Sequence, residues 1–209
     1  MKKEQRKNKE AVIVLSLLLL IFGGFLAGYF YVYYKNNFEY AGQNFTKIKE
    51  GNLEFYYTKF PIIYKQKLTK IFNVYLREDP RKNNIPINTN ISFSREVIFS
   101  LDKEIDLCKD SGMAQLNLNI FISSFPWVKN VSVALTEEDY ALEKNKLLIK
   151  DCSNATEDRT IILVKKSDKS SIEKKEENCY IFYVNNCEYQ KVAERFIVGV
   201  IAQVNDKKI

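Results

Sequence analysis

The longest uniform stretch of the sequence is an apolar run of 24 residues, Ala11 to Tyr34, without a charged side chain. As an α-helix it measures roughly 36 Å, which covers the hydrocarbon core of a bilayer with a margin for tilt. A cleaved signal peptide is the alternative, but its apolar core is only about 7 to 15 residues long and ends in an A-x-A-like site. We therefore expect residues 11–34 to form a retained transmembrane helix in contact with the lipid bilayer.

Charges on either side of this run predict its orientation. The first ten residues carry five basic side chains against Glu4 and Glu10. Short basic flanks stay in the cytoplasm, so residues 1–10 are expected to be a cytoplasmic tail of a single-pass protein of the cell membrane. The chain beyond Tyr34 is then outside, and the aromatic residues between Tyr29 and Tyr34 match the belt at a membrane interface.

After the membrane run, the pattern in the first half of the chain predicts β structure. Residues 35–52 are polar and contain two glycines, so a spacer is expected there. Short runs rich in Tyr, Phe, Ile and Val follow, and Pro61 favours an edge strand or a bend in one of them. The strands predicted in this half lie at 53–57, 68–76, 91–93 and 97–101.

Two helices are predicted in the second half. Residues 110–125 fit a helix capped by Asp110 or Ser111, and their alternation also allows a strand; we favour the helix. Its repeating apolar positions are Met113, Leu116, Ile120 and Phe125. The clearest helix begins at Tyr189 and ends near Val204, because its apolar residues fall on one stripe. The charged residues expected to face mostly away from the core in this helix are Lys191, Glu194 and Arg195.

Strands and connections complete the second half. The strands are predicted at 128–135, 160–165 and 180–184, with a brief one at 147–149. Thr136 is expected to open a short helix with the acidic residues after it. The Lys/Glu/Ser-rich residues 167–178 are expected to be a solvated hairpin connection.

These elements predict an α+β or α/β fold, with a mixed sheet and two or three helices packed on it. A β-rich part is expected at 53–105 and an α/β part at 106–209. The roughly 175 residues beyond the membrane run suffice for one domain, or one domain with a small module. Of 32 basic and 26 acidic residues, 27 and 24 lie beyond Tyr34, and no basic stripe with interleaved aromatic residues stands out. No nucleic-acid partner is therefore expected.

All four cysteines, Cys108, Cys152, Cys179 and Cys187, follow the membrane run. An even number in an oxidising compartment indicates disulfides, and four buried free thiols are the alternative. Three connectivities are possible. Cys108–Cys152 is favoured because it closes a long loop, whereas Cys179 and Cys187 flank a predicted strand whose ends stand too far apart.

Four Asn-x-Ser/Thr sequons fit an exported domain and are candidate glycosylation sites. Since the chain is rich in Asn, they support the topology only weakly. The four sites are Asn44, Asn90, Asn130 and Asn154.

Missing residue types limit the chemistry. The chain has no histidine, and only four of its glycines lie beyond the membrane run. Histidine-based catalysis, a zinc site of the usual Cys/His kind and a Gly-rich phosphate loop are therefore not expected. No catalytic residue, cofactor or metal is predicted. Carboxylates such as Glu137–Asp139 and Glu176–Glu177 can act as acid and base in principle, but adjacent carboxylates in a charged run are usually solvated.

Two side chains are candidates for contact with a partner. Arg81 follows Asp79-Pro80 and has the geometry to hold a carboxylate or phosphate with two hydrogen bonds. The competing interpretation is a turn in which Asp79 bonds its own backbone and Arg81 braces the sheet. Trp127 is a candidate anchor for a partner, or else it closes the core after the preceding helix.

Two longer motifs carry a resemblance. They are YLREDPRKNNIP at 75–86, and NCYIFYVNNC at 178–187 running into KVAERF at 191–196. With an N-terminal anchor and Cys108 before a helix, the chain resembles a family of small single-pass archaeal membrane proteins with a Cys-containing extracytoplasmic α/β domain. The resemblance implies the anchored topology and the cysteine chemistry, and it brings no activity, cofactor or catalytic residue.

The sequence thus predicts a structural or interaction module of the cell envelope, without evident enzymatic activity, whose partner is an envelope or membrane protein. One alternative is a ligand-binding or accessory subunit with an aromatic-lined pocket that includes Arg81. A second is a carboxylate-based hydrolase of envelope polymers. Pilin-like polymerisation is a more distant alternative, and no convincing processing site precedes Ala11.

Overall fold

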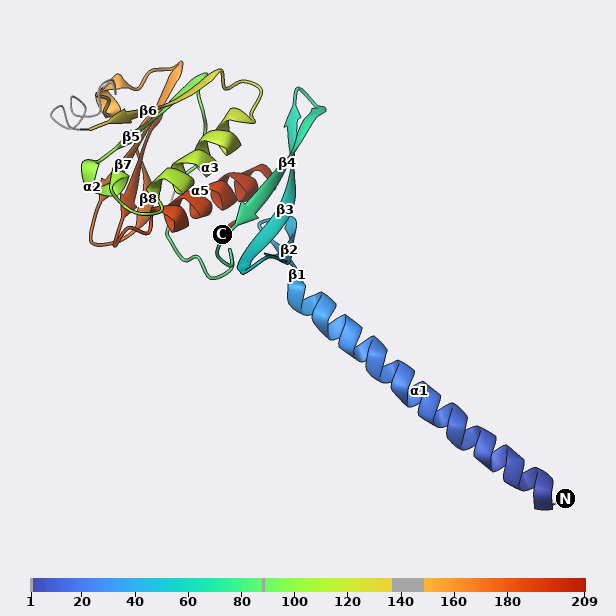
Figure 1. Ribbon diagram of the computed structural model, residues 1–209. Coiled ribbons are helices and arrows are strands. Elements are labelled where there is room, and N and C mark those ends of the chain that lie inside the picture. The colour runs from blue at the N-terminus through green and yellow to red at the C-terminus, as the bar shows by residue number, and fades with distance from the viewer. Residues whose placement is uncertain (1, 88, 137–148) are drawn as a thin grey trace. The chain divides into compact units, whose positions relative to one another are not determined.

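The computed structural model describes residues 2–87, 89–136 and 149–209, with side chains from Leu15 onward. The chain divides into two compact units, Met1–Phe38 and Glu39–Ile209. The first unit is dominated by one helix, α1 (Lys2–Asn36), in which Leu15–Asn36 is long and apolar enough to cross a membrane (Figure 1). Side chains from Leu15 to Tyr34 are exposed on every side of α1, as expected for a helix whose surroundings are apolar.

The second unit begins with a four-stranded sheet in the order β1-β2-β3-β4. β2, β3 and β4 pair antiparallel. Lys65 and Gln66 connect β3 to β4 and both have positive φ, 48° and 63°, which is the backbone of a two-residue hairpin turn that matches strand twist. The strands of this sheet are β1 (Asn37–Tyr40), β2 (Gln43–Glu50), β3 (Leu53–Tyr64) and β4 (Lys67–Leu76).

The rest of this unit contains a five-stranded sheet in the order β6-β5-β7-β9-β8. Its first four strands are parallel, and β8 pairs antiparallel with β9 at the edge. Parallel strands are covered on both faces, which explains continuous apolar runs such as Ile161–Val164. The strands are β5 (Glu96–Leu101), β6 (Asn130–Leu135), β7 (Arg159–Lys166), β8 (Ser171–Glu176) and β9 (Cys179–Val184).

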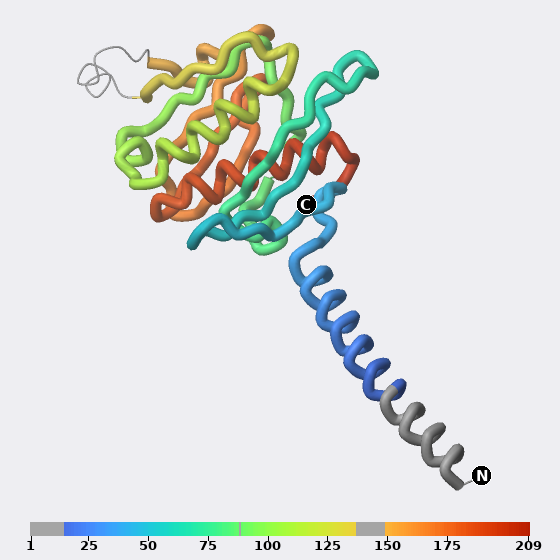
Figure 2. Tube along the Cα trace, turned by 45° about the vertical axis from the view of Figure 1, so that its right-hand side comes forward, coloured from blue at the N-terminus to red at the C-terminus, as the bar shows by residue number. Residues whose placement is uncertain are grey.

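Helices α3 and α5 pack together between the two sheets (Figures 1 and 2). On one side, the ring of Phe196 in α5 lies 4.8 Å from that of Phe182 in β9. On the other side, the ring of Phe121 in α3 lies 5.5 Å from Phe72 in β4 and 6.2 Å from Phe60 in β3. The core therefore has aromatic contacts on both sides of the helical layer. The helices are α2 (Lys103–Asp106), α3 (Ser111–Ser123) and α5 (Tyr189–Val204).

The two disulfides lie on opposite sides of the five-stranded sheet. Cys152–Cys179 joins η1 (Cys152–Asn154) to β9, within the buried cluster that also contains Ile98 and Ile161. Cys108–Cys187 joins the connection before α3 to the loop before α5, on the helical side. The favoured pair Cys108–Cys152 is therefore wrong, because the sheet stands between these two cysteines. Both disulfides indicate that this unit matures in an oxidising compartment.

The predicted fold class is confirmed: an apolar N-terminal helix precedes an α+β unit with one antiparallel and one mixed sheet, and the described residues of this unit contain helices α2, α3 and α5. The helix favoured over a strand at 110–125 is α3, and the helix from Tyr189 to Val204 is α5. The predicted strand at 160–165 lies within β7, and the one at 180–184 lies within β9. In β7 and β9 the continuous apolar runs match the burial of a parallel sheet on both faces.

The spacer expected at 35–52 is wrong, because β1 and β2 occupy most of it. Phe45 in β2 is fully buried, and Gly42 and Gly51 provide positive-φ turns beside the strand. The boundary between the two compact units lies between Phe38 and Glu39. The expected β-rich part and the expected α/β part therefore belong to the same compact unit.

Two other expectations differ from the structure. No strand forms at 91–93, because side chains satisfy this backbone: the Ile91 N–H donates to Gln203 Oε1, and the Ser92 N–H donates to the Tyr180 hydroxyl. The connection expected at 167–178 contains β8, in which Ile172 is fully buried and the exposed Lys and Glu residues lie on a sheet edge. The helix expected from Thr136 and most of the strand expected at 147–149 lie outside the described residues.

Candidate interaction surface

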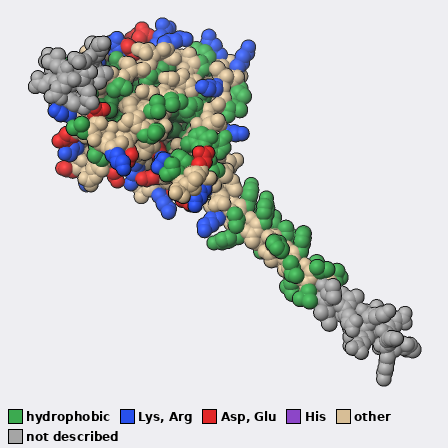
Figure 3. Space-filling view, viewed as in Figure 1, with side chains coloured by type: hydrophobic (Ala, Val, Ile, Leu, Met, Phe, Trp, Pro, Cys, Tyr) green, Lys and Arg blue, Asp and Glu red, His purple; other side chains and the backbone are tan. Residues whose placement is uncertain are grey.

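An apolar stripe of three side chains on α3 is exposed to solvent. Met113, Leu116 and Ile120 are 57%, 50% and 50% exposed, and their spacing places them on one face of the helix. The sequence pattern placed these residues on the core side. The structure instead buries another face, which includes Ala114 and Leu118. Figure 3 shows hydrophobic side chains gathered over α3. Contiguous exposed apolar patches are typical of interaction surfaces, so this stripe is a candidate for one.

The strand β4 lies close to α3 at two points. Near the C-terminal end of α3, Phe121 packs on Phe72, with 5.5 Å between ring centres. Near the N-terminal end, Met113 and Arg77 line the same cleft, which has a volume of about 370 Å³. α3 and β4 therefore run antiparallel and side by side. We call the surface formed by the α3 stripe and the neighbouring edge of β4 the α3–β4 surface.

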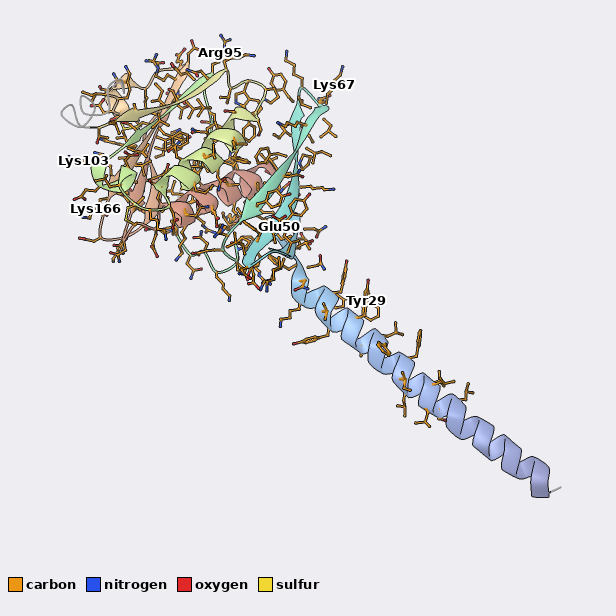
Figure 4. All side chains as sticks on the ribbon, viewed as in Figure 1. Tyr29, Glu50, Lys67, Arg95, Lys103 and Lys166 are labelled. Carbon is orange, nitrogen blue, oxygen red and sulfur yellow. A yellow bond between two sulfur atoms is a disulfide. The ribbon has the colours of Figure 1, made fainter. Side chains whose placement is uncertain are left out.

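The edge of β4 beside α3 has no strand partner in the described part of the chain. β4 is the last strand of its sheet and pairs only with β3 there. An edge strand presents alternate N–H and C=O groups that can pair with another chain. Lys67 and Lys70 are the charged residues of β4, and Lys67 lies at the tip of the hairpin (Figure 4). α3 contains no charged residue.

A buried carboxylate fixes the end of β4 to α5. Glu194 is only 3% exposed, and its two oxygens accept hydrogen bonds from the backbone N–H groups of Arg77 (2.6 Å) and Glu78 (3.2 Å). Gln190 Nε2 donates a third bond of 2.8 Å to this carboxylate. Burial raises the pKa of Glu194 from 4.5 to about 7, although these three hydrogen bonds act in the opposite direction. The carboxylate thus holds the C-terminal end of β4 in place.

The neighbouring Arg195 is also buried, and it contacts β1, the strand at the opposite edge of the first sheet from β4. Its Nε donates to the Ile85 carbonyl oxygen at 2.7 Å, and its Nη1 donates to the Tyr40 hydroxyl at 3.2 Å. The expectation that Glu194 and Arg195 face away from the core is wrong, because the four-stranded sheet covers the outer side of α5. Their isolation as charged residues in the apolar run 192–202 was the signal for this role.

Arg81 forms an ion pair with Asp79 within one turn. Arg81 Nη2 lies 2.6 Å from Asp79 Oδ2, and Nε donates to Oδ1 at 2.9 Å. The backbone N–H of Arg81 also donates to Oδ1, which is the self-bonded turn of the competing interpretation. Arg81 holds the pKa of the Asp79 carboxyl below its ordinary value. The guanidinium is therefore engaged within the turn, and 46% of the Arg81 side chain is exposed.

Trp127 lies just beyond α3, beside the hairpin of β3 and β4. Its ring centre is 5.0 Å from that of Phe125 and 5.8 Å from that of Tyr64. It is half-buried, so it closes the aromatic cluster and also contributes to the surface. Trp127 extends the α3–β4 surface at the end opposite Met113.

The other candidate positions are dispersed over the second unit. The sequon residues Asn44, Asn90 and Asn130 are exposed, whereas Asn154 is half-buried and its Oδ1 accepts from the Asp151 N–H. Among the acidic candidates, Glu176–Glu177 is exposed at the end of β8, and Glu137–Asp139 lies outside the described residues. Within 2–87, 89–136 and 149–209, no three Cys, Asp or Glu side chains gather as metal ligands.

Comparison with known proteins adds no relative: no family model, curated protein or solved structure matches the chain. The class of protein is therefore defined by its fold and its surface alone. It is an α+β domain closed by two disulfides, preceded by a candidate membrane helix, with an apolar surface beside a strand edge.

Proposed function

We propose that this protein is a membrane-anchored interaction module of the cell envelope. α1 holds it in the membrane with its N-terminus in the cytoplasm, and the unit Glu39–Ile209 binds an envelope or membrane protein outside. The observation that carries the proposal is the exposed stripe of Met113, Leu116 and Ile120. Contiguous exposed apolar side chains on a domain surface are typical of sites that a partner covers.

Two further features support the outside location. The first is the pair of disulfides, which persist in oxidising compartments and are reduced in the cytoplasm of most cells. The second is the basic stretch before the apolar run, which favours a cytoplasmic N-terminus. Both point to the same orientation from independent physical causes.

Labelling of introduced cysteines tests this orientation in intact cells. Lys174 is exposed on β8, so Lys174→Cys is expected to react with a membrane-impermeant maleimide added outside. Gln5→Cys, in the basic tail, is the matched control and is expected to react only after the cells are permeabilised. The reverse pattern would place the second unit in the cytoplasm and refute the proposal.

Cross-linking in native membranes tests the binding role. The wild-type chain is expected to form a cross-linked adduct, which Leu116→Ser/Ile120→Ser reduces at least fivefold. Leu53→Ser/Val204→Ser is the control, because it removes two exposed apolar side chains that belong to β3 and α5 and not to α3 or β4. An adduct that survives the first pair as well as the second would show that the stripe does not bind the partner.

A further inference from the structure

We propose, building on the interaction role above, that the α3–β4 surface takes up an extended segment of another protein as a fifth strand of the first sheet. The added strand pairs with the free edge of β4, and its alternate apolar side chains pack on Met113, Leu116 and Ile120. Acidic residues of the segment meet the lysines of β4. Addition of a strand to an exposed edge, with specificity from alternate side chains, is an established mode of peptide recognition.

The dimensions of the two elements agree with this arrangement. α3 has 13 residues and measures about 20 Å, which about six extended residues also span. Along the helix, Met113 and Ile120 are separated by about 10 Å. Side chains on one face of a strand repeat about every 7 Å, so two or three of them cover the stripe. An added strand of about six residues is therefore long enough to cover the stripe.

The cleft at one end of the surface contains an acceptor that has no partner. Gln190 Oε1 is buried and makes no hydrogen bond with any described residue. Gln190, Met113 and Arg77 line this cleft together. The end of β4 at this point is already fixed by Glu194, so the edge is ordered before a ligand arrives. A preformed edge lowers the entropic cost of binding an extended segment.

Charge determines which occupant fits. Lys67 and Lys70 lie in the first half of β4, and neither β4 nor α3 contains a carboxylate. The cleft at the other end of the surface is lined by charges of both signs, which are those of Arg77, Glu78, Asp110, Glu188 and Lys191. Edge lysines oppose pairing with another edge strand, and a second copy of β4 would bring two further lysines and no carboxylate. A segment with carboxylates beside its apolar residues meets complementary charge instead. The charges thus favour an acidic, alternating segment of a different protein over a second copy of this chain.

A selection experiment tests the proposal with the full chain in nanodiscs. The probe is a display library of nine-residue segments with apolar residues at alternate positions and random residues between them. We expect enriched segments to carry Asp or Glu at the random positions. Binding of a synthetic enriched segment is expected to slow amide hydrogen exchange in β4 and to weaken at least tenfold with Leu116→Ser/Ile120→Ser. Every second backbone nitrogen of that segment is N-methylated, in two versions that differ in which set of nitrogens is blocked. Only the version that blocks the N–H groups facing β4 is expected to abolish binding.

Control variants separate the possible outcomes. Lys67→Glu/Lys70→Glu is expected to weaken acidic segments at least fivefold, whereas Lys174→Glu/Lys175→Glu on β8 leaves them unchanged. The proposal is overturned if no segment is enriched, if basic segments are enriched equally, or if sedimentation shows a dimer that Lys67→Glu/Lys70→Glu alters. If one of these outcomes is found while Lys174→Cys is labelled from outside and the cross-linked adduct still forms, the strand addition is refuted and the proposed function is not. If the labelling pattern is reversed, the proposed function fails as well.

Discussion

Glu194 provides a pH-dependent test of how the helical layer is fastened to the first sheet. Its carboxylate is buried under the end of β4 and accepts hydrogen bonds from the backbone of Arg77 and Glu78. Replacement by Gln keeps the volume and one carbonyl acceptor but removes the titration. The comparison between wild type and Glu194→Gln therefore isolates the free energy of charging this one group in the folded state.

The magnitude follows from the displaced pKa. The ordinary value is 4.5 and the folded value is about 7, and each unit of difference is worth about 1.4 kcal/mol. The folded chain therefore binds this proton more tightly than the unfolded chain. This contribution to stability is complete below about pH 4.5 and is lost as the pH rises through about 7. Between pH 4.5 and pH 8, wild type is expected to lose about 3 kcal/mol that Glu194→Gln does not lose.

Urea unfolding of the full chain in detergent, at half-unit steps from pH 4.5 to pH 8, measures this difference. The expected result is a wild-type free energy of unfolding that falls relative to Glu194→Gln over this range. Glu176→Gln serves as the control, since it removes an exposed carboxyl on β8. Parallel curves for wild type and Glu194→Gln would refute the reasoning and show that the carboxylate is already charged at low pH.

Three further changes test the packing. Cys152→Ala/Cys179→Ala opens a loop with a sequence separation of 27 residues and is expected to cost about 3 kcal/mol in denaturant unfolding; unchanged stability would contradict the cross-link. Phe121→Ala removes a fully buried ring between the first sheet and the helices and is expected to cost about 3–5 kcal/mol in the same assay, so a loss under 1 kcal/mol would contradict the layered core. Gly42→Ala is expected to lower the melting temperature more than Gly51→Ala, because both have positive φ but only at Gly42 does an added Cβ approach another side chain to 2.7 Å; equal losses would contradict that contact.

The local hydrophobic pattern was sufficient to predict those elements whose surroundings are uniform along their length. The apolar helix at the N-terminus, the strand within β7 and the stripe of α5 were all predictable, because a single period of hydrophobic residues describes each. The favoured helix at 110–125 was also correct.

Tertiary context decided the remaining features. α5 is covered on two sides, so Glu194 and Arg195 are buried although an amphipathic pattern places them outward. α3 shows the converse, since Met113 and Leu116 continue an apolar pattern that the fold leaves exposed. The cysteine pairing depended on which side of a sheet each residue reaches, and spacing along the chain carries no information about that.

The candidate surface was only partly predictable for the same reason. Trp127 was identified as a possible anchor, and it lies at one end of the α3–β4 surface. The free edge of β4 follows from strand order, which the sequence does not reveal. Arg81 has the expected chemistry, but Asp79, two residues earlier, engages it.

Mapping of the disulfides in protein purified from membranes tests whether the second unit matures on the oxidising side of the membrane. Thiols are blocked during lysis, and peptides are compared by mass before and after reduction. We expect two quantitative cross-links, Cys108–Cys187 and Cys152–Cys179, in a domain that matures outside the cytoplasm. Four free thiols, blocked in the freshly lysed cells, would contradict an anchored domain on the oxidising side of the membrane.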